Sequence, residues 1–343
     1  MTNTEYPAAL ERLMPNIFTV ETILGCDLSC PECALGGGFI KRKKGRMNFE
    51  QFKLIAEKIK PFCKYLYLHI WGEPILNDDI YKIIKYASTF TRTNISTNGN
   101  QITMEKAENL ILSGVTDIIV SIDGVSNEVY GKYRVGGNVD KAIEALKMLQ
   151  EFKIKHESCT NIVPQFIVFK HNQHEMEVFQ ELCRYIGLKP AYKAPYLRNQ
   201  NSHYSLSDYP QFVRPIFQEI SKLKAAMAEC PNVKNVFTIL RDGSVVICCH
   251  DYGKITCFGN IFEQSVEEIW NSHLFKKTRW NISSGNPPNF CLNHCMTWFL
   301  GQAGKDPYFS CDADMMGESE KDLTQSLDNS IETFVCNTAI NNI

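Results

Sequence analysis

Three cysteines near the amino terminus constrain this chain more than any other feature. Cys26, Cys30 and Cys33 are spaced as C-x3-C-x2-C. Three thiolates can hold three irons of a cubane iron–sulfur cluster and leave the fourth iron open to another ligand. For the spacing alone, a zinc site or cysteines that fill core space are alternatives. The pattern predicts a loop around a metal cluster that has one open position.

Composition is that of a globular protein. The 343 residues are 44% hydrophobic and 22% charged, with a net charge of −2, so we expect no nucleic-acid partner and no membrane partner. The first residues lack the layout of a signal peptide, and no apolar run is long enough to span a bilayer. We therefore expect a cytoplasmic protein whose 14 Cys are metal ligands and core thiols rather than disulfides.

Short β-rich segments alternate with helical patterns as far as Tyr196. The expected strands are Ile17–Ile23, Tyr65–Ile70, Thr93–Ser96, Asp117–Ile122, Val163–Phe169 and Ala191–Tyr196. The expected helices are Asn48–Lys60, Asp78–Thr89, Thr103–Ser113, Asn138–Phe152 and Gln173–Ile186. This alternation predicts an α/β fold with a parallel sheet. Six units are too few for a closed eight-stranded barrel, so we expect an open, partial (β/α)6 TIM-like barrel.

The rest of the chain divides by composition. We expect a barrel over residues 1–197, a linker and helix over 198–229, a small α+β domain over 230–311 and an acidic polar tail over 312–343. In the third part, Phe237–Cys248 predicts a hairpin that turns at the two residues Asp242-Gly243. The segment Ser265–Glu268 predicts a capping box that opens a helix.

Polar motifs follow the expected strands, where parallel sheets bind ligands. They are Trp71-Gly72-Glu73-Pro74, Ser96-Thr97-Asn98-Gly99 and Ser121-Ile122-Asp123-Gly124. Each alone is also ordinary turn chemistry. Gly36-Gly37-Gly38 follows the cysteines and suggests that a ligand approaches the backbone closely.

Together these motifs resemble the radical S-adenosylmethionine (SAM) superfamily over residues 16–196. The resemblance implies that Cys26, Cys30 and Cys33 hold a [4Fe-4S] cluster whose open iron binds SAM. It implies that the cofactor-binding residues are Glu73, which accepts from the SAM amino group, and Ser96, Asn98, Asp123, Arg134 and Asn172. One electron, which we expect from a flavodoxin or ferredoxin, then cleaves SAM to a 5′-deoxyadenosyl radical that abstracts a hydrogen atom.

Two residues depart from the family pattern. Glu32 stands where relatives commonly have an aromatic residue, and Trp71 stands where they commonly have a second glycine. Neither change removes a ligand. The negative charge of Glu32 beside the cluster is expected to make the cluster harder to reduce.

Further cysteines gather after residue 229. Four thiolates from two separated groups suit a fully ligated cluster or a structural zinc. The region resembles the SPASM and twitch extensions of radical SAM enzymes, which implies one auxiliary [4Fe-4S] cluster. Its implied ligands are Cys230, Cys248, Cys291 and Cys295, with Cys257 and Cys311 as further candidates. Cys249 could replace Cys248, fill core space, or act catalytically by donating a hydrogen atom to a substrate radical.

Several functions fit these motifs. The first is dehydrogenation or epimerisation of a small polyol, sugar or aminocyclitol, which the short segment before Ile17 favours over a peptide-docking domain. The alternative is maturation of a ribosomally synthesised peptide by a crosslink, thioether or epimerisation. A non-enzyme iron–sulfur or zinc protein leaves Glu73 unexplained. A dehydrogenase also needs a base, for which His69, His250 and Asp251 are candidates.

Overall fold

The computed structural model describes residues 14–196, 204, 206–212 and 230–294. Its main element is a nine-stranded sheet in the order β11-β10-β9-β1-β4-β5-β6-β7-β8. Six of these strands are parallel and follow each other in chain order. They are β1 (Ile17–Val20), β4 (Tyr65–Tyr67), β5 (Arg92–Thr97), β6 (Asp117–Ser121), β7 (Asn161–Ile167) and β8 (Ala191–Lys193). The predicted open barrel of six parallel strands is confirmed.

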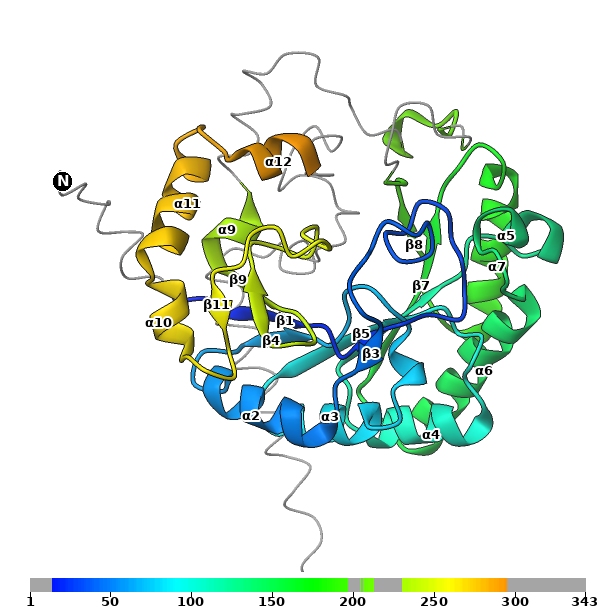
Figure 1. The fold of residues 1–343 in the computed structure, drawn as a ribbon. Helices are drawn as coiled ribbons and strands as arrows, with labels where there is room; N and C mark the ends of the chain where they lie inside the picture. Colours follow the sequence, from blue (N-terminus) through cyan, green and yellow to red (C-terminus); the bar gives the residue numbers. More distant parts are fainter. Residues whose placement is uncertain (1–13, 197–203, 205, 213–229, 295–343) are drawn as a thin grey trace, which may run out of the picture.

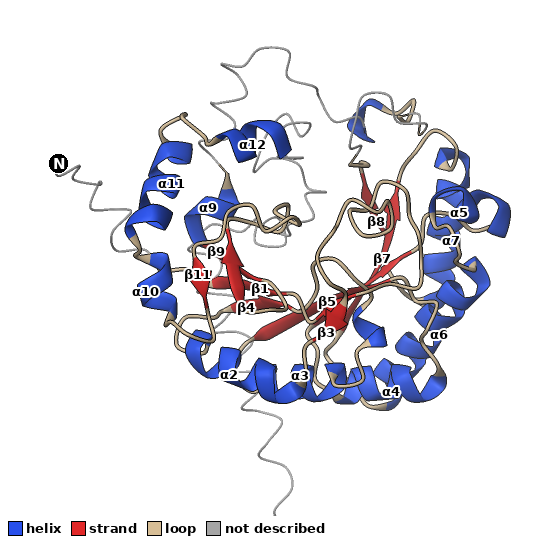
Figure 2. Cartoon of the chain, viewed as in Figure 1, coloured by secondary structure: helices blue, strands red, loops and turns tan. Residues whose placement is uncertain are grey.

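Helices cover the outer face of the curved sheet (Figure 2). The five predicted helices are α2 (Phe49–Ile59), α3 (Ile80–Ala87), α4 (Met104–Leu112), α6 (Val139–Lys155) and α7 (Met176–Ile186). The side chains of Asn48, Thr103 and Asn138 cap three of them by accepting from backbone amides of the first turn. A sixth, α5 (Asn127–Tyr133), begins at a Ser126 cap and was not predicted, because it has only seven residues.

Short elements join these units. A separate two-stranded sheet is formed by β2 (Ile23–Leu24) and β3 (Gly45–Arg46). The 3₁₀ turns are η1 (Pro74–Leu76), η2 (Gln173–Glu175) and η3 (Pro210–Phe212). The expected first strand is therefore divided, because the chain leaves the main sheet after Val20 and pairs with β3 from Ile23 onward.

The second region extends the barrel sheet. Strand β9 (Val236–Ile239) pairs in parallel with β1, on the edge opposite β4, and β10 (Ser244–Val246) and β11 (Gly259–Asn260) continue the sheet antiparallel. Phe18 and Phe237 lie 5.5 Å apart between ring centroids. The helices of this region are α9 (Pro231–Asn235), α10 (Val266–Trp270), α11 (His273–Ser283) and α12 (Asn289–His294). The predicted hairpin thus shares its core with the barrel (Figure 1).

The hairpin turn has three residues rather than the two predicted. Leu240 and Ser244 close it, since the Leu240 amide donates to the Ser244 carbonyl and the Gly243 amide donates back to Leu240. Gly243 has a φ of 81°, which is the left-handed glycine that follows a type I turn in such loops. The predicted capping box of Ser265 and Glu268 is confirmed.

Other parts of the prediction lie largely or wholly outside the described residues. Of the linker and helix expected over 198–229, residues 204 and 206–212 are described, and they contain η3. The acidic tail over 312–343 lies outside entirely. Within the described part of the chain, no helix has the length and apolar character needed to cross a membrane.

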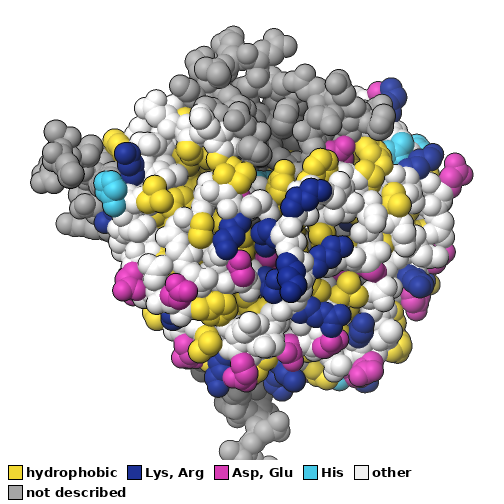
Figure 3. Space-filling view, viewed as in Figure 1, with side chains coloured by type: hydrophobic (Ala, Val, Ile, Leu, Met, Phe, Trp, Pro, Cys, Tyr) yellow, Lys and Arg dark blue, Asp and Glu magenta, His cyan; other side chains and the backbone are white. Residues whose placement is uncertain are grey.

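Basic side chains gather on one face. The segment Lys41–Arg46 carries five of them, and β3 at its end lies near the centre of Figure 1, where Figure 3 shows Lys and Arg side chains close together. One member, Arg42, is turned inward and pairs with the buried Glu21 at 2.6 Å. Arg42 therefore ties this basic loop to the end of β1.

Candidate active site

The three amino-terminal cysteines line one cavity at the carboxyl ends of the strands. Its volume is about 160 Å³. Its other walls come from the segment after β4, from the carboxyl ends of β5, β6 and α5, and from the residues directly after β5 and α5. They include Trp71, Gly72, Glu73, Ser96, Thr97, Asn98, Ser121, Tyr133 and Arg134. The fold therefore brings the predicted strand-end motifs to the predicted cluster loop.

The glycines after Cys33 serve the loop itself. A Cβ atom on Gly36 would lie 2.6 Å from the backbone nitrogen and oxygen of Cys30, and one on Gly37 would lie 2.4 Å from the Pro31 carbonyl oxygen. These distances are shorter than any real contact, so a side chain at either position would displace the loop backbone. The predicted close approach is therefore between two parts of the cluster loop, and it needs no ligand.

Burial controls the chemistry of these thiols. It raises the pKa of Cys26 to about 12 and that of Cys30 to about 11, in the latter case against the lowering effect of the Arg134 charge. The Arg134 Nη1 atom lies 4.0 Å from the Cys30 Sγ atom. Without a bound cation, both thiols are protonated at neutral pH, and binding of iron would release these protons.

Glu73 joins two strand ends. Its carboxylate accepts hydrogen bonds from the backbone amides of Ile75 at 3.1 Å and Asn98 at 2.7 Å, and its residue is 2% exposed. Burial raises its pKa to about 7, while these backbone bonds act in the opposite direction. Asn98 in turn donates to Asp27 at 2.8 Å and so anchors the cysteine loop. Each oxygen of the Glu73 carboxylate thus already accepts a hydrogen bond from a backbone amide. The predicted bond to the SAM amino group would be an additional hydrogen bond.

Asp123 and Asn172 lie behind the cavity wall. Asp123 accepts from Arg134 Nε at 2.5 Å and from the Ile167 amide at 2.6 Å. Asn172 donates to the carbonyls of Asp123 and Ile167 and accepts from the Phe169 amide. Both residues are fully buried and neither lines the cavity. Their geometry is that of residues that position Arg134, whereas Glu73, Ser96, Asn98 and Arg134 reach the cavity.

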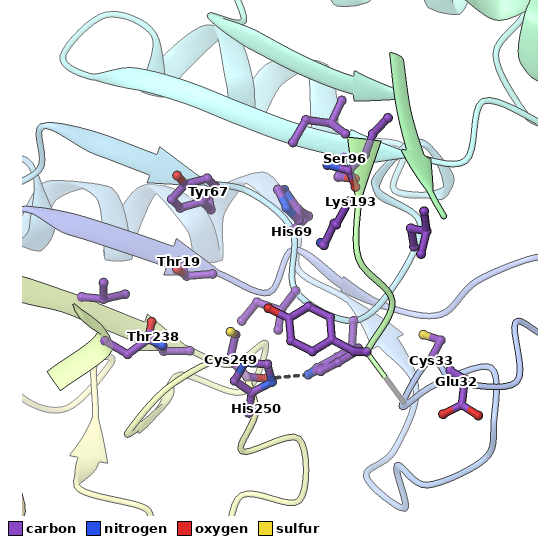
Figure 4. A pocket seen from close by; sticks show the side chains of 18 of the residues that line it. Thr19, Glu32, Cys33, Tyr67, His69, Ser96, Lys193, Thr238, Cys249 and His250 are labelled. Carbon is purple, nitrogen blue, oxygen red and sulfur yellow. Dashed lines mark hydrogen bonds between the residues drawn. The ribbon is translucent and has the colours of Figure 1, made fainter. Parts of the chain in front are cut away.

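A second, larger cavity of about 250 Å³ adjoins the first. The two share Cys33, Ile70, Trp71, Ser96 and Tyr133 as lining residues. The second cavity reaches across the sheet to β9 and to the loop after β10. Figure 4 shows its labelled lining residues, which are Thr19, Glu32, Cys33, Tyr67, His69, Ser96, Lys193, Thr238, Cys249 and His250. A substrate in this cavity would lie beside the predicted cluster.

The predicted acid–base and thiol candidates divide between this cavity and the loop behind it. Cys249, His69 and His250 line the cavity. Asp251 does not, because its carboxylate accepts from the Ile255 and Thr256 amides and folds the loop. Trp71 donates from its indole to the Cys249 carbonyl at 2.8 Å. The predicted roles in catalysis stay predictions, and their positions make Cys249, His69 and His250 available to a substrate.

Sequence reasoning did not single out Lys193 or Thr238 as site residues. Both line the second cavity, and they are 8% and 0% exposed. The signal for Lys193 was a charged residue inside a strand pattern, at a position that alternation directs toward the barrel interior. Nothing in the local sequence distinguishes Thr238 from other threonines in strands.

The second set of predicted ligands is partly described. Cys248 and Cys291 are buried and Cys230 is partly buried, and all three pack into or against the main core. They come from the loop after β10, from α12 and from the residue before α9. Cys257 is exposed. The fourth predicted ligand, Cys295, and the further candidate Cys311 lie outside the described residues.

The donor set around Cys26, Cys30 and Cys33 fits a cubane cluster. In a cubane each thiolate binds a different iron, so the sulfur atoms need not point at one centre. No three His, Cys, Asp or Glu side chains among the described residues converge on a single-ion site. Three soft donors on one cavity wall, with a guanidinium beside one of them, match a thiolate-bound cluster of net negative charge.

Comparison with family models agrees with this geometry. Residues 20–182 match the radical SAM superfamily, and residues 230–296 match an iron–sulfur cluster-binding domain of the SPASM type. The first match runs from the last residue of β1 through β7 and covers most of α7. The second match includes the predicted ligands Cys230, Cys248, Cys291 and Cys295.

Two named proteins are similar in sequence to part of this chain. A mycofactocin maturase of Mycolicibacterium smegmatis is 29% identical over 50% of this chain and 43% of its own length. The subtilosin biosynthesis protein AlbA of Bacillus subtilis is 25% identical over 82% of this chain and 64% of its own length. The chain thus spans less than two thirds of either relative.

The fold also resembles a solved structure. SuiB of Streptococcus suis, bound to its precursor peptide SuiA, aligns with a TM-score of 0.60 and 15% identity over 78% of this chain and 67% of that one. This likeness concerns the fold, and it agrees with the open barrel. The chain therefore carries a radical SAM domain over residues 20–182 and a SPASM-type iron–sulfur cluster-binding domain over residues 230–296, and these domains imply a [4Fe-4S] cluster, SAM and an auxiliary iron–sulfur cluster.

Proposed function

We propose that this enzyme modifies a ribosomally synthesised peptide. The observation that carries the proposal is the second cavity, which shares a wall with the cluster cavity and has room for one amino-acid side chain. The names of the relatives support it, since two of them concern mycofactocin maturation and subtilosin biosynthesis, and SuiB was solved with a precursor peptide. None of these three names points to a polyol, sugar or aminocyclitol substrate.

Cys26, Cys30 and Cys33 would hold the first cluster, and Ser96, Asn98, Arg134 and the Gly72–Glu73 segment would surround SAM. When bound and reduced, this pair would supply a 5′-deoxyadenosyl radical for hydrogen-atom abstraction. The remaining roles belong to residues of the chain itself. Trp71 and Tyr133 form the wall shared by both cavities. Cys230, Cys248, Cys291 and Cys295 would hold the auxiliary cluster, and a flavodoxin or ferredoxin would supply electrons.

The Cys249 thiol is the proposed hydrogen donor if the peptide modification is an epimerisation. Cys249 lines the second cavity and is partly buried, so its thiol can reach a substrate radical. Donation of a hydrogen atom from sulfur leaves the substrate at its original oxidation level and leaves a thiyl radical on Cys249, which would regain the thiol by taking one electron from the flavodoxin or ferredoxin and one proton from solvent. A crosslink or thioether would instead remove two hydrogens from the peptide, one as an atom to the 5′-deoxyadenosyl radical and one as a proton together with an electron that the auxiliary cluster would accept, and it needs no donor.

The test uses the reconstituted, reduced enzyme with SAM and candidate precursor peptides in deuterated water. Formation of 5′-deoxyadenosine that rises with peptide, together with a peptide two hydrogens lighter or carrying one solvent deuterium, supports the proposal. Iron analysis comes first, because about eight irons per chain are expected for two cubanes.

Matched variants sharpen the result. Cys30→Ala should abolish 5′-deoxyadenosine formation, whereas Cys159→Ala, at an exposed cysteine, should leave it intact. Cys249→Ala should prevent deuterium incorporation without stopping SAM cleavage. Stimulation by a polyol, sugar or aminocyclitol, with no response to any peptide, would overturn the peptide assignment and leave the radical SAM activity standing.

A further inference from the structure

A patch of positive charge lies beside the loop of the three amino-terminal cysteines. Lys41, Lys43, Lys44 and Arg46 are all exposed, and we call these four residues the basic patch. Figure 3 shows Lys and Arg side chains gathered near the centre of one face, at the position of β3 in Figure 1. No member of the patch lines either cavity. The patch therefore has no part in enclosing SAM or a substrate.

Carboxylates offset little of this charge. Lys41, Lys43 and Lys44 form no ion pair with any residue that the structure describes. Arg46 pairs with Asp78, but the two side chains are 52% and 90% exposed, and exposed ion pairs are weak. Ammonium groups that gather without carboxylate partners produce a positive potential that extends into solvent and attracts an acidic surface.

The second region of the chain holds the patch in place. Arg241, in the turn between β9 and β10, donates from Nη2 to the Lys43 carbonyl at 3.1 Å. Its guanidinium packs on Gly45, where an added Cβ atom would lie 2.9 Å from the Arg241 Cζ atom. Arg42, within the same segment, donates from Nε to the Tyr252 carbonyl at 2.8 Å. Arg241 thus adds a fifth cation beside the patch, and the backbone of the patch is fixed by these contacts.

The patch is also joined to the predicted cluster loop. The Gly37 amide donates to the Cys33 carbonyl at 2.8 Å, so the chain folds back on the cysteine turn. The Lys41 ammonium then donates to the Gly38 carbonyl at 2.8 Å. Cys33 lines both cavities, whereas Gly37 and Gly38 are exposed. A protein bound to the patch would therefore contact the outer side of the loop that is predicted to hold the first cluster.

The chemistry implied for this loop requires a redox partner. Each cleavage of SAM consumes one electron, which has to reach the first cluster from outside the chain. Electron transfer slows steeply as the distance between two redox groups grows, so the donor has to dock close to the loop. An acidic precursor peptide is the other candidate for a basic surface. Such a peptide has to enter the second cavity, however, and the basic patch does not line that cavity.

We propose that the basic patch docks an acidic one-electron carrier protein, which passes its electron directly to the first cluster. One electron leaves the reduced carrier and enters the cluster, and no atom is transferred. The proposal rests on the protein electron donor named in the proposed function, and it does not depend on the substrate. Lys43 and Lys44 are the central contacts, because their ammonium groups make no hydrogen bond or ion pair with the described residues.

Binding is measured first, without turnover. The reconstituted, oxidised holoenzyme is titrated with an oxidised flavodoxin of net negative charge in isothermal titration calorimetry. The double variant Lys43→Glu, Lys44→Glu should bind flavodoxin about tenfold more weakly. An increase in ionic strength from about 20 mM to about 300 mM should also weaken the native complex. The control is Lys141→Glu, Lys147→Glu at two exposed lysines of α6, which changes the net charge equally and should leave binding unchanged.

Reduction is measured second. Under anaerobic conditions, stopped-flow absorbance follows the electron from reduced flavodoxin to the cluster, and formation of 5′-deoxyadenosine is measured without peptide. The patch variant should slow both flavodoxin-driven reactions about tenfold. Dithionite is a small reductant that needs no docking surface, so the rates with dithionite should be unchanged.

The outcomes separate this proposal from the proposed function. Unchanged flavodoxin binding in the patch variant, or an equal loss in the α6 control, overturns the docking surface. A patch variant that keeps flavodoxin but loses affinity for a precursor peptide assigns the patch to the substrate and also overturns it. Lys43→Gln, Lys44→Gln is a second variant should the charge reversal disturb the cluster, with an expected loss of flavodoxin binding of about threefold. Failure to modify any peptide affects the proposed function alone, because neither measurement includes a peptide.

Discussion

The indole Nε1–H of Trp71 donates a hydrogen bond of 2.8 Å to the carbonyl oxygen of Cys249. Trp71 follows β4 of the barrel, and Cys249 follows β10 of the second region, 178 residues later. The Trp71 ring also meets the Tyr252 ring edge-on, with centroids 6.0 Å apart. The residue that replaces a family glycine thus joins the cluster cavity to the loop that carries a predicted auxiliary ligand and the candidate donor thiol.

Trp71→Phe is expected to loosen this junction. The variant keeps an aromatic ring against Tyr252 and removes one hydrogen bond, which contributes about 1 kcal/mol. Amide hydrogens over residues 247–252 should exchange about fivefold faster in hydrogen–deuterium exchange mass spectrometry. Trp280→Phe on α11 is the control and should leave this segment unchanged. Equal exchange in the two variants would mean that the hydrogen bond does not hold the loop.

Glu21→Gln should strongly destabilise the fold. Glu21 is fully buried and binds both Arg42 Nη atoms, at 2.6 and 2.8 Å, and the Arg241 amide at 3.1 Å. Removal of the Glu21 charge leaves the largely buried Arg42 without its carboxylate partner. Loss of one partner of a buried ion pair lowers the free energy of unfolding by about 3 kcal/mol or more. Chemical denaturation measures the loss. Glu128→Gln, whose carboxylate is 86% exposed, is the control, with an expected change below about 0.5 kcal/mol.

Cluster removal should leave slowly reacting thiols at Cys26 and Cys30. Because burial raises their pKa values to about 12 and 11, few thiolates exist at pH 7. Iodoacetamide should label the exposed Cys159 first in the folded apo protein. The rates at Cys26 and Cys30 should rise about tenfold per pH unit between pH 7 and 9. Mass spectrometry of each peptide follows the labelling, and labelling of Cys30 as fast as Cys159 at pH 7 would contradict the argument.

His69 should make the protein less stable in acid. Its pKa is lowered from 6.5 to about 4 in the folded chain. Between these values the unfolded chain binds more protons, so the free energy of unfolding falls as pH drops from 6.5 toward 4. His69→Phe removes this contribution, on the order of 3 kcal/mol, and should flatten the acid limb of the stability curve. His174→Phe, at an exposed histidine, is the control. An unchanged acid limb in His69→Phe would show that His69 is not held neutral.

Local patterns were enough to predict the barrel. The strand-and-helix alternation from Ile17 to Tyr196 gave the six parallel strands and five helices, because each element carries its own periodicity and capping residues. The first cysteine triplet could also be recognised in the sequence, since the three predicted ligands Cys26, Cys30 and Cys33 lie within eight residues. The short helix α5 and the three-residue turn at Arg241–Gly243 could not be predicted from the sequence, because short elements depend on contacts with the rest of the fold.

The sequence by itself identified the radical SAM motifs, the alternation of strands and helices and the loop predicted to hold the first cluster, because these depend on residues close together in the chain. Only the tertiary structure decided what faces the substrate. In the folded chain β9 pairs with β1, and Cys249 lies within hydrogen-bond distance of Trp71. Asp123 and Asn172 lie behind Arg134, and Lys193 and Thr238 line the same cavity. The physical reason is that a cavity is a property of packing between distant segments, and no local pattern records which buried polar groups the fold leaves facing it.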